Sequence, residues 1–318
     1  MNLNTSIGFG TAAIGRPQYI NIKQEAQKPF DIAEFKQQGL KMLDYAYALG
    51  VRYFDTAPGY GLAEQLMIEW LGTKNDPAIT VATKWGYTYV ANFDPNANVH
   101  EVKSHSLEKL NEQWTVSKQL LPYLKYYQIH SATLETGVLE NQAVLEWLFQ
   151  LKKDNGVKVG LTTTGSNQTE VLKRALEVHY AGELLFEVFQ CTYNILDQSI
   201  LSLGKEIIKE GKQLVLKEVL ANGRLFPNPN YPNYKALYQK LEGLSEKYEV
   251  GIDAILMHYC MKTLEGAVVL SGANKKEHLD QNLKATDFQL SPEEIADLSQ
   301  FKIPPTAYWE ERKQLTWN

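Results

Sequence analysis

The chain has 318 residues, of which 44% are hydrophobic and 22% are charged, and its formal net charge is −5. This is ordinary composition for a folded protein, and an acidic chain is not expected to bind nucleic acid or an anionic membrane surface. No apolar run approaches the roughly 20 residues of a membrane span, and the polar start is unlike a secretory signal. Cys191 and Cys260 have no neighbouring cysteine. We therefore expect buried thiols in a reducing compartment, and a cytoplasmic protein.

Short apolar runs rich in β-forming residues recur along the chain, and helical patterns follow them. The eight predicted strands are Ser6–Thr11, Val51–Asp55, Ile79–Lys84, Lys125–His130, Val157–Leu161, Phe186–Gln190, Gln213–Lys217 and Ala267–Ser271. Predicted helices include the segment ending at Gly50 and the ranges Ala143–Asn155, Gln168–His179, Tyr234–Tyr248 and Ile252–Thr263. Strand–helix alternation predicts a parallel sheet, because a parallel return needs a long crossover.

Eight such units without a linker predict a (β/α)₈ TIM barrel. We expect a single domain over residues 1–318, with long loops after strands one, three and seven and a C-terminal tail over the barrel mouth. The alternative is an open doubly wound sheet with a G-x-G-x-x-G fingerprint. Gly8 and Gly10 are followed by Gly15, which is too far along the chain to complete that pattern.

Polar side chains end three successive predicted strands. Asp55 ends the second, Lys84 the third and His130 the fourth, while Tyr60 follows the second strand in a loop that contains Pro58-Gly59. Barrel enzymes carry their chemistry at the C-terminal ends of the strands, and neighbouring strands place these ends side by side. The four residues are therefore expected to share one pocket.

These four residue types suit proton delivery to a carbonyl or alkoxide oxygen. A lysine ammonium near Tyr60 is expected to lower the pKa of the phenol from about 10. Asp55 is expected to pair with Lys84 and keep it charged, and His130 to orient the same oxygen. Because no side chain donates a hydride, this chemistry requires a nicotinamide cofactor.

Ordered motifs along nearly the whole chain resemble the aldo-keto reductase family. They are Gly8-Phe9-Gly10-Thr11, Asp55-Thr56-Ala57-Pro58-Gly59-Tyr60-Gly61 with Ala63-Glu64, Ala82-Thr83-Lys84, Gln128-Ile129-His130-Ser131, Val159-Gly160-Leu161-Thr162, Gln190 with Tyr193-Asn194, Leu220-Ala221-Asn222-Gly223-Arg224-Leu225, and Ser271-Gly272-Ala273 leading to Leu279 and Asn282. The resemblance implies a barrel that binds NADPH or NADH across its mouth. It also implies Tyr60 as general acid, with Asp55, Lys84 and His130 as its partners.

The same resemblance implies a set of cofactor-binding residues along the barrel mouth. Thr162, Thr163 and Gln190 would meet the nicotinamide carboxamide, and Lys217-Glu218 stands where many members stack a tyrosine on the nicotinamide. Lys275, Lys276 and His278 would recognise a 2′-phosphate and Asn282 the adenine, with the preference between NADPH and NADH left open. The other implied residues are Thr11, Leu220, Asn222, Arg224, Ser271, Gly272 and Asn274.

Aromatic residues are frequent in the loops and the tail that should surround the mouth, and they suit sugars or aromatic aldehydes. An alternative is that they only pack loops over the barrel. The substrate candidates are Tyr19, Trp85, Tyr87, Phe226, Tyr308 and Trp309, with Tyr89 and Tyr231 nearby in sequence. The resemblance is strongest to members that act on aldoses, including sugar dehydrogenases, and implies a small-molecule partner and a monomer or homodimer.

Three other interpretations of these residues compete with this one. Lys84 could form a Schiff base in a lyase, or the fold could serve as a slow, cofactor-binding regulatory subunit. His100, Glu101 and His105 do not have the four-residue histidine spacing of a zinc helix, so we expect surface side chains and no metal site.

Overall fold

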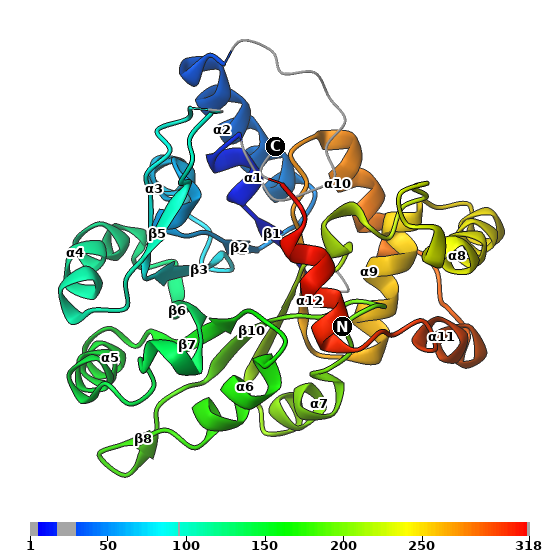
Figure 1. The fold of residues 1–318 in the computed structure, drawn as a ribbon. Coiled ribbons are helices and arrows are strands. Elements are labelled where there is room, and N and C mark those ends of the chain that lie inside the picture. Colours follow the sequence, from blue (N-terminus) through cyan, green and yellow to red (C-terminus); the bar gives the residue numbers. More distant parts are fainter. Residues whose placement is uncertain (1–5, 18–29, 95, 317–318) are drawn as a thin grey trace.

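The structure is a computed structural model that describes residues 6–17, 30–94 and 96–316. Eight parallel strands close into a barrel in the order β1-β12-β11-β10-β7-β6-β3-β2, surrounded by helices (Figure 1). The barrel strands are β1 (Ile7–Gly10), β2 (Tyr53–Asp55), β3 (Thr80–Trp85), β6 (Leu124–Ala132), β7 (Lys158–Thr163), β10 (Val188–Thr192), β11 (Gln213–Lys217) and β12 (Val268–Ser271). Each predicted strand is present, and the predicted TIM barrel is confirmed.

The described helices connect the barrel strands, and the last of them follow the final strand toward the C-terminus. They are α1 (Ala12–Gly15), α2 (Ile32–Ala48), α3 (Ala63–Leu71), α4 (Leu107–Ser117), α5 (Gln142–Asn155), α6 (Gln168–Leu176), α7 (Leu201–Lys209), α8 (Lys235–Tyr248), α9 (Ile252–Thr263), α10 (Lys276–Leu283), α11 (Pro292–Ser299) and α12 (Pro305–Lys313). Single 3₁₀ turns occur at η2 (Pro58–Tyr60), η3 (Lys118–Leu120), η4 (Leu134–Thr136), η5 (Ala221–Gly223), η6 (Pro232–Tyr234) and η7 (Lys284–Thr286).

Several element boundaries differ from the sequence prediction by one to three residues, and the ends of β6 and α6 show why. Strand β6 continues two residues beyond His130, because Ser131 adopts a left-handed φ of 53° and a register shift bulges the strand there. Helix α6 ends at Leu176 rather than His179. His179 instead begins a short hairpin, in which β8 (His179–Tyr180) pairs with β9 (Glu183–Leu184).

The bottom of the barrel is filled by apolar side chains that point inward. Tyr53, Ala82, Val188, Val215, Val268 and Leu270 form this buried cluster, with Tyr126 packed against it. The interior is so crowded that a Cβ at Gly160 would lie 1.8 Å from the carbonyl oxygen of Val188. A strand side chain two residues further on points to the same side. The next inward row therefore holds Asp55, Lys84, Gln128, Gln190 and Lys217.

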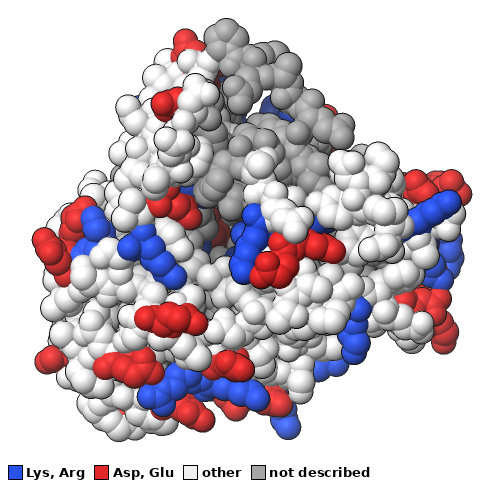
Figure 2. All heavy atoms as spheres, in the orientation of Figure 1, with Lys and Arg blue, Asp and Glu red and all other residues white. Residues whose placement is uncertain are grey.

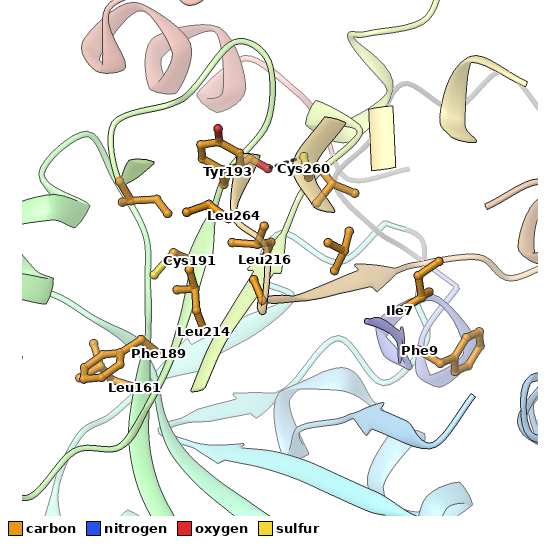
Figure 3. Close-up of a cluster of buried hydrophobic side chains, with 14 of the residues drawn as sticks. Ile7, Phe9, Leu161, Phe189, Cys191, Tyr193, Leu214, Leu216, Cys260 and Leu264 are labelled. Carbon is orange, nitrogen blue, oxygen red and sulfur yellow. Dashed lines mark hydrogen bonds between the residues drawn. The ribbon is translucent and has the colours of Figure 1, made fainter. Parts of the chain in front are cut away.

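The alternate side chains point outward and form the larger core beneath the helices (Figure 3). Leu161, Phe189 and Leu214 are at most 1% exposed there. Cys191 on β10 and Cys260 on α9 are fully buried free thiols, as expected, and burial raises the pKa of Cys191 to about 12. The Cys260 thiol contacts the carbonyl oxygen of Tyr193 at 3.7 Å.

A hairpin and the C-terminal helix lie at the ends of the strands. The loop after β3 contains β4 (Tyr87–Tyr89) and β5 (Glu101–Lys103), which pair antiparallel. Sequence patterns did not predict them, because neither segment has the apolar run that marks the barrel strands. Helix α12 lies across the barrel in Figure 1. Arg312 of α12 pairs with Glu218, directly after β11, through an Nη2–Oε1 distance of 2.5 Å.

Surface charges of both signs are interspersed on the face shown in Figure 2. This distribution gives no extended basic surface there of the kind that binds a phosphate backbone. Among the helices of the described residues, none combines the length and the apolar composition that crossing a membrane requires.

Candidate active site

A buried ion pair occupies the inward row of the barrel above the apolar cluster. Lys84 Nζ lies 2.6 Å from Asp55 Oδ2, and the two side chains are 0% and 3% exposed. The ammonium also donates to the carbonyl oxygen of Thr56 at 3.0 Å, and Gln190 donates to Asp55 Oδ1 at 2.7 Å. Buried charges need this kind of complete pairing, because desolvation is costly. The expected pairing of Lys84 with Asp55 is therefore present.

Tyr60 sits at the end of the 3₁₀ turn η2, which Pro58 begins. Gly61 follows with a φ of 64°, so the chain reverses immediately after the tyrosine. The Lys84 ammonium lies 4.8 Å from the centroid of the phenol ring. Tyr60 Oη and His130 Nε2 are 3.5 Å apart, a separation typical of the loose hydrogen bonds of ligand-free active sites. The structure thus brings together all four residues that the strand ends predicted.

The expectation that Lys84 lowers the pKa of Tyr60 is wrong in this structure. Burial raises the pKa of the phenol well above its usual value, the Asp55 carboxylate raises it further, and Arg16 opposes them. The physical reason is that the charge of Lys84 is already balanced by Asp55 at 2.6 Å, so the pair presents little net positive field. Tyr60 is consequently a protonated phenol across the neutral range.

His130 is held as a neutral imidazole. Burial lowers its pKa well below the usual value, and the positive charges of Lys84, Arg16 and Lys217 lower it further. Its position follows from the β6 bulge, and its carbonyl oxygen contacts His105 Nε2 at 2.9 Å. A neutral imidazole can share a hydrogen bond with the phenol or with a substrate oxygen without adding charge.

The segment after β12 has the features of an anion-binding site. Gly272 and Asn274 are exposed, a Cβ at Gly272 would meet no atom within 4 Å, and no side chain caps the first turn of α10. Free N–H groups at a helix start favour phosphate groups. Lys275, Lys276 and His278 are exposed around this turn. These residues fit the phosphate-bearing part of a nicotinamide dinucleotide.

Two other predicted cofactor residues, Ser271 and Asn282, stabilise this segment through buried hydrogen bonds. Ser271 Oγ donates to Asn282 Oδ1 at 2.7 Å, and Asn282 Nδ2 donates to Asp253 Oδ2 at 2.7 Å. Asn282 is only 3% exposed. Its side chain therefore ties β12 to α9 and α10 while its neighbours remain exposed.

The remaining predicted cofactor residues fall into two groups. Thr11, Thr162 and Thr163 are buried at the strand ends, where their hydroxyls bond to Asp55, Ser131 and Gln168 in turn. The others, which line the end of β11 and the following loop, are Lys217, Leu220, Asn222 and Arg224. Lys217 points into the barrel and donates to Thr192 Oγ1 at 2.9 Å.

Arg224 is fully buried and binds the C-terminal helix. Its Nη1 donates to the carbonyl oxygen of Tyr308 and to Glu311, both at 3.1 Å, and its guanidinium lies 4.2 Å from the Tyr308 ring centroid. The Nη1 group of this side chain is thus directed at α12, while its Nε donates to the carbonyl oxygen of Ala221 at 3.0 Å.

Only some of the predicted substrate residues are exposed to solvent. The Tyr87 ring lies 4.8 Å from the His130 ring, and Phe226 is partly exposed. Trp85 is fully buried, because the residue after the inward-pointing Lys84 must point outward. Tyr19 lies outside the described residues.

Tyr308 and Trp309 are covered as well. Tyr308 is fully buried and its hydroxyl accepts from Asn194 at 3.0 Å, while Trp309 donates to Asp197 at 3.1 Å. These two aromatic residues anchor α12 to the loop after β10, which agrees with the alternative that some of the aromatic candidates only pack loops.

The expectation that His100, Glu101 and His105 are surface side chains is wrong for His100, while Glu101 and His105 are only partly exposed. His100 is buried, Glu101 pairs with Arg16 at 2.8 Å, and His105 contacts the His130 carbonyl, where burial lowers its pKa to about 4. The β4–β5 hairpin folds this segment back toward Tyr60, a long-range contact without a local sequence signal.

Sequence reasoning also missed the roles of Arg16 and Glu64. Arg16 is 4% exposed beside Tyr60. Glu64 accepts hydrogen bonds from Thr83 at 2.6 Å and Ser117 at 2.9 Å, and burial raises its pKa to about 7. Glu64 belongs to the motif after Tyr60. The helical spacing of the apolar residues of α3 could have placed Glu64 on the buried face of that helix.

Comparison with known proteins decides the family. The model described as the Aldo/keto reductase family matches residues 6–303. The chain belongs to the aldo-keto reductases. This aldo-keto reductase is therefore an NAD(P)-dependent oxidoreductase that acts on carbonyl and alcohol groups, and a small carbonyl compound is its partner.

Individual relatives resemble this chain at low identity over most of its length. Aldo-keto reductase str7 of Strobilurus tenacellus is 25% identical over 323 residues, covering 93% of this chain and 88% of the relative. L-galactose dehydrogenase of Arabidopsis thaliana is 24% identical over 285 residues, covering 86% and 84%. The structure of an aldo-keto reductase from Bacillus halodurans in its holo form superposes with a TM-score of 0.68 at 22% identity, covering 97% and 95%. That structural likeness shows the shared barrel fold.

Proposed function

We propose that Tyr60 exchanges the proton with the substrate oxygen in this reaction, and that Asp55, Lys84 and His130 support it. The single observation that carries this proposal is the position of the Tyr60 phenol between Lys84, 4.8 Å from its ring centroid, and His130 Nε2, 3.5 Å from its hydroxyl. When bound, the nicotinamide supplies or accepts the hydride. Tyr60 donates its phenolic proton to the oxygen of the carbonyl group that becomes an alcohol, and it takes that proton back in the oxidation.

The supporting residues stabilise charge and orientation. As the phenol gives up its proton, the Lys84 ammonium offsets the Asp55 charge that disfavours the phenolate, and Gln190 helps to hold Asp55 in place. His130, neutral by burial, can hydrogen-bond the substrate oxygen next to Tyr60. A Schiff base on Lys84 is disfavoured, since its nitrogen is committed to Asp55 and Thr56. The intact arrangement also argues against a slow regulatory subunit.

The cofactor would be held by the loop after β11 and the segment after β12. The helix start at α10 and the exposed Lys275 and Lys276 are suited to the phosphate groups. Thr162, Thr163 and Gln190 remain the residues proposed for the nicotinamide end. A lysine ammonium can pair with a 2′-phosphate that NADH lacks.

Replacing Lys275 and Lys276 together by alanine is expected to weaken NADPH binding about tenfold while NADH binding changes less. Titration of the fluorescence of each reduced nicotinamide measures this difference. The matched control is Lys240→Ala with Lys247→Ala, which removes two lysines of α8 that pair with α11. Equal loss for both cofactors, or none for either, contradicts the assignment of these lysines to the 2′-phosphate.

We propose an aldose as the substrate class and a cytoplasmic monomer or homodimer as the working form. The relative named L-galactose dehydrogenase supports the substrate class, as do the aromatic Tyr87 and the carboxylate of Glu101 at the mouth. The two free thiols support a reducing compartment.

An aldose panel tests this proposal. Absorbance at about 340 nm, where reduced nicotinamide absorbs, is followed with aldoses and simple aldehydes, in both directions and with each nicotinamide. We expect turnover of at least one aldose in one direction. Turnover of aldehydes alone would contradict the substrate class but leave the carbonyl chemistry intact.

A further inference from the structure

Two glycines bring the loop that ends α1 against the turn that carries Tyr60. Gly15 accepts a hydrogen bond from the Leu62 backbone at 2.8 Å, and a Cβ at Gly15 would lie 2.1 Å from the Tyr60 carbonyl oxygen. A Cβ at Gly61 would in turn lie 2.4 Å from the Gly15 carbonyl oxygen. This backbone approach requires glycine at both positions, and it sets the next residue, Arg16, beside the tyrosine.

Arg16 is fixed there from two sides. Its Nη1 donates to the carbonyl oxygen of Gly59, the residue before Tyr60, at 2.9 Å, and to Glu101 Oε2 at 2.8 Å. The guanidinium carbon lies 5.5 Å from the centroid of the Tyr60 ring, and the side chain is only 4% exposed. Arg16 therefore links the Tyr60 turn to the β4–β5 hairpin, with its charge against the phenol ring.

Arg16 is one of several charged groups around the Tyr60 phenol. The charged or titratable groups facing Tyr60 are Asp55 on β2, Lys84 on β3, Glu101 on β5, His130 on β6, Arg16 after α1 and Glu218 after β11. Asp55 is paired with Lys84, and Glu218 with Arg312. Burial raises the pKa of Tyr60 most, and the Asp55 carboxylate raises it further. Glu101 and Glu218 also raise the pKa of Tyr60, whereas Arg16 lowers it.

We propose that Arg16 is a positioning residue for Tyr60, which holds the turn that carries the phenol and stabilises the phenolate, and that Glu101 holds Arg16 in place and moderates its charge. This proposal rests on the proposed role of Tyr60 as the proton donor. An arginine suits this position because it stays charged at all working pH values and its planar group can bond two acceptors while lying over a ring.

The test compares the alkaline limb of the pH profile of kcat/KM for carbonyl reduction, where activity falls as the phenol loses its proton. Arg16→Met is expected to lower kcat about tenfold and to move the limb up by about 0.5 to 1 pH unit, since a cation near the phenol is lost. Glu101→Gln is expected to move the limb down, because an anion is lost. Arg16→Lys should leave the limb near its wild-type position while kcat falls, because charge is kept and the planar contacts are lost.

The opposite signs separate this role from a purely structural one. If Arg16→Met and Glu101→Gln shift the limb in the same direction, or leave it where it is, the proposal is wrong. Should Arg16→Met fail to fold, Glu101→Gln and Arg16→Lys decide the question alone. Lys153→Met, which removes a cation from an exposed pair far along the chain on α5, is the control for the loss of one positive charge.

The Tyr60→Phe variant distinguishes an error in the role of Arg16 from an error in the proposed function of Tyr60. If that variant keeps wild-type turnover and the same alkaline limb, the role of Tyr60 itself is refuted. If it loses turnover while the Arg16 and Glu101 variants behave like the wild type, only the role of Arg16 is refuted.

Discussion

Tyr60→Phe should reduce turnover about 10²- to 10⁴-fold, the range expected when a positioned general acid is removed. The substitution deletes the hydroxyl that lies 3.5 Å from His130 Nε2, and it leaves in place the ring whose centroid is 4.8 Å from the Lys84 ammonium. Steady-state rates of carbonyl reduction and alcohol oxidation with the best substrate of the panel measure the effect. Both directions should fall together, since the same group donates and accepts the proton.

Binding of the reduced nicotinamide is the control for this variant. The exposed residues after β12 that are proposed to hold the cofactor lie on other elements than Tyr60, so the dissociation constant should change less than threefold, or by about 0.6 kcal/mol. A Tyr60→Phe enzyme with wild-type rates would refute the proposed acid, and one that no longer binds cofactor would show that the substitution had disturbed the mouth as a whole.

The protonation state of Tyr60 adds a pH dependence to this expectation. Burial raises the pKa of the phenol, so the group is protonated at neutral pH and ready to act as an acid. The reduction should therefore hold its rate through neutral pH and decline only in the alkaline range, and Tyr60→Phe should lose that decline along with its activity.

The sequence predicted the part of the site that lies on regular strands. Asp55 and Lys84 end strands that are apolar and short, and the barrel rule places such ends together. Their alternation with Tyr53 and Ala82 could even have fixed which side chains point inward. His130 was predicted as a strand end, although the bulge that aims it could not be foreseen, because it depends on the backbone of Ser131.

The missed residues depend on contacts between distant loops. Arg16 and Glu101 are 85 positions apart. They meet because Gly15 and Gly61 allow two backbones to touch, and because a hairpin of two three-residue strands forms after β3. Neither residue has a periodic pattern around it. The sign of the pKa shift of Tyr60 was missed for a related reason, since it depends on burial and on the exact balance of paired charges around the ring.

Lys84→Met should lower the free energy of unfolding by about 3–5 kcal/mol, as well as abolishing most turnover. The ammonium is fully buried and 2.6 Å from Asp55 Oδ2, so its loss leaves a carboxylate in the barrel interior with Gln190 as its remaining side-chain donor. Urea denaturation at several pH values measures this. A proton taken up at low pH removes the charge of this unpaired carboxylate, and with it the cost of burying that charge. The loss of stability should therefore be small near about pH 4 and grow as the pH rises.

Two further variants show whether the carboxylate is the cause. Asp55→Asn added to Lys84→Met removes the unpaired charge, and the double variant should recover more than half of the lost stability at neutral pH, with the pH dependence gone. Lys153→Met breaks an ion pair whose two side chains are 47% and 49% exposed, and it should cost less than about 1 kcal/mol. If Lys84→Met instead costs no more than Lys153→Met, the pair does not hold the strand ends together. The arrangement of the proton-transfer site would then have to depend on the hydrogen bonds from Gln190 and on the turn at Tyr60.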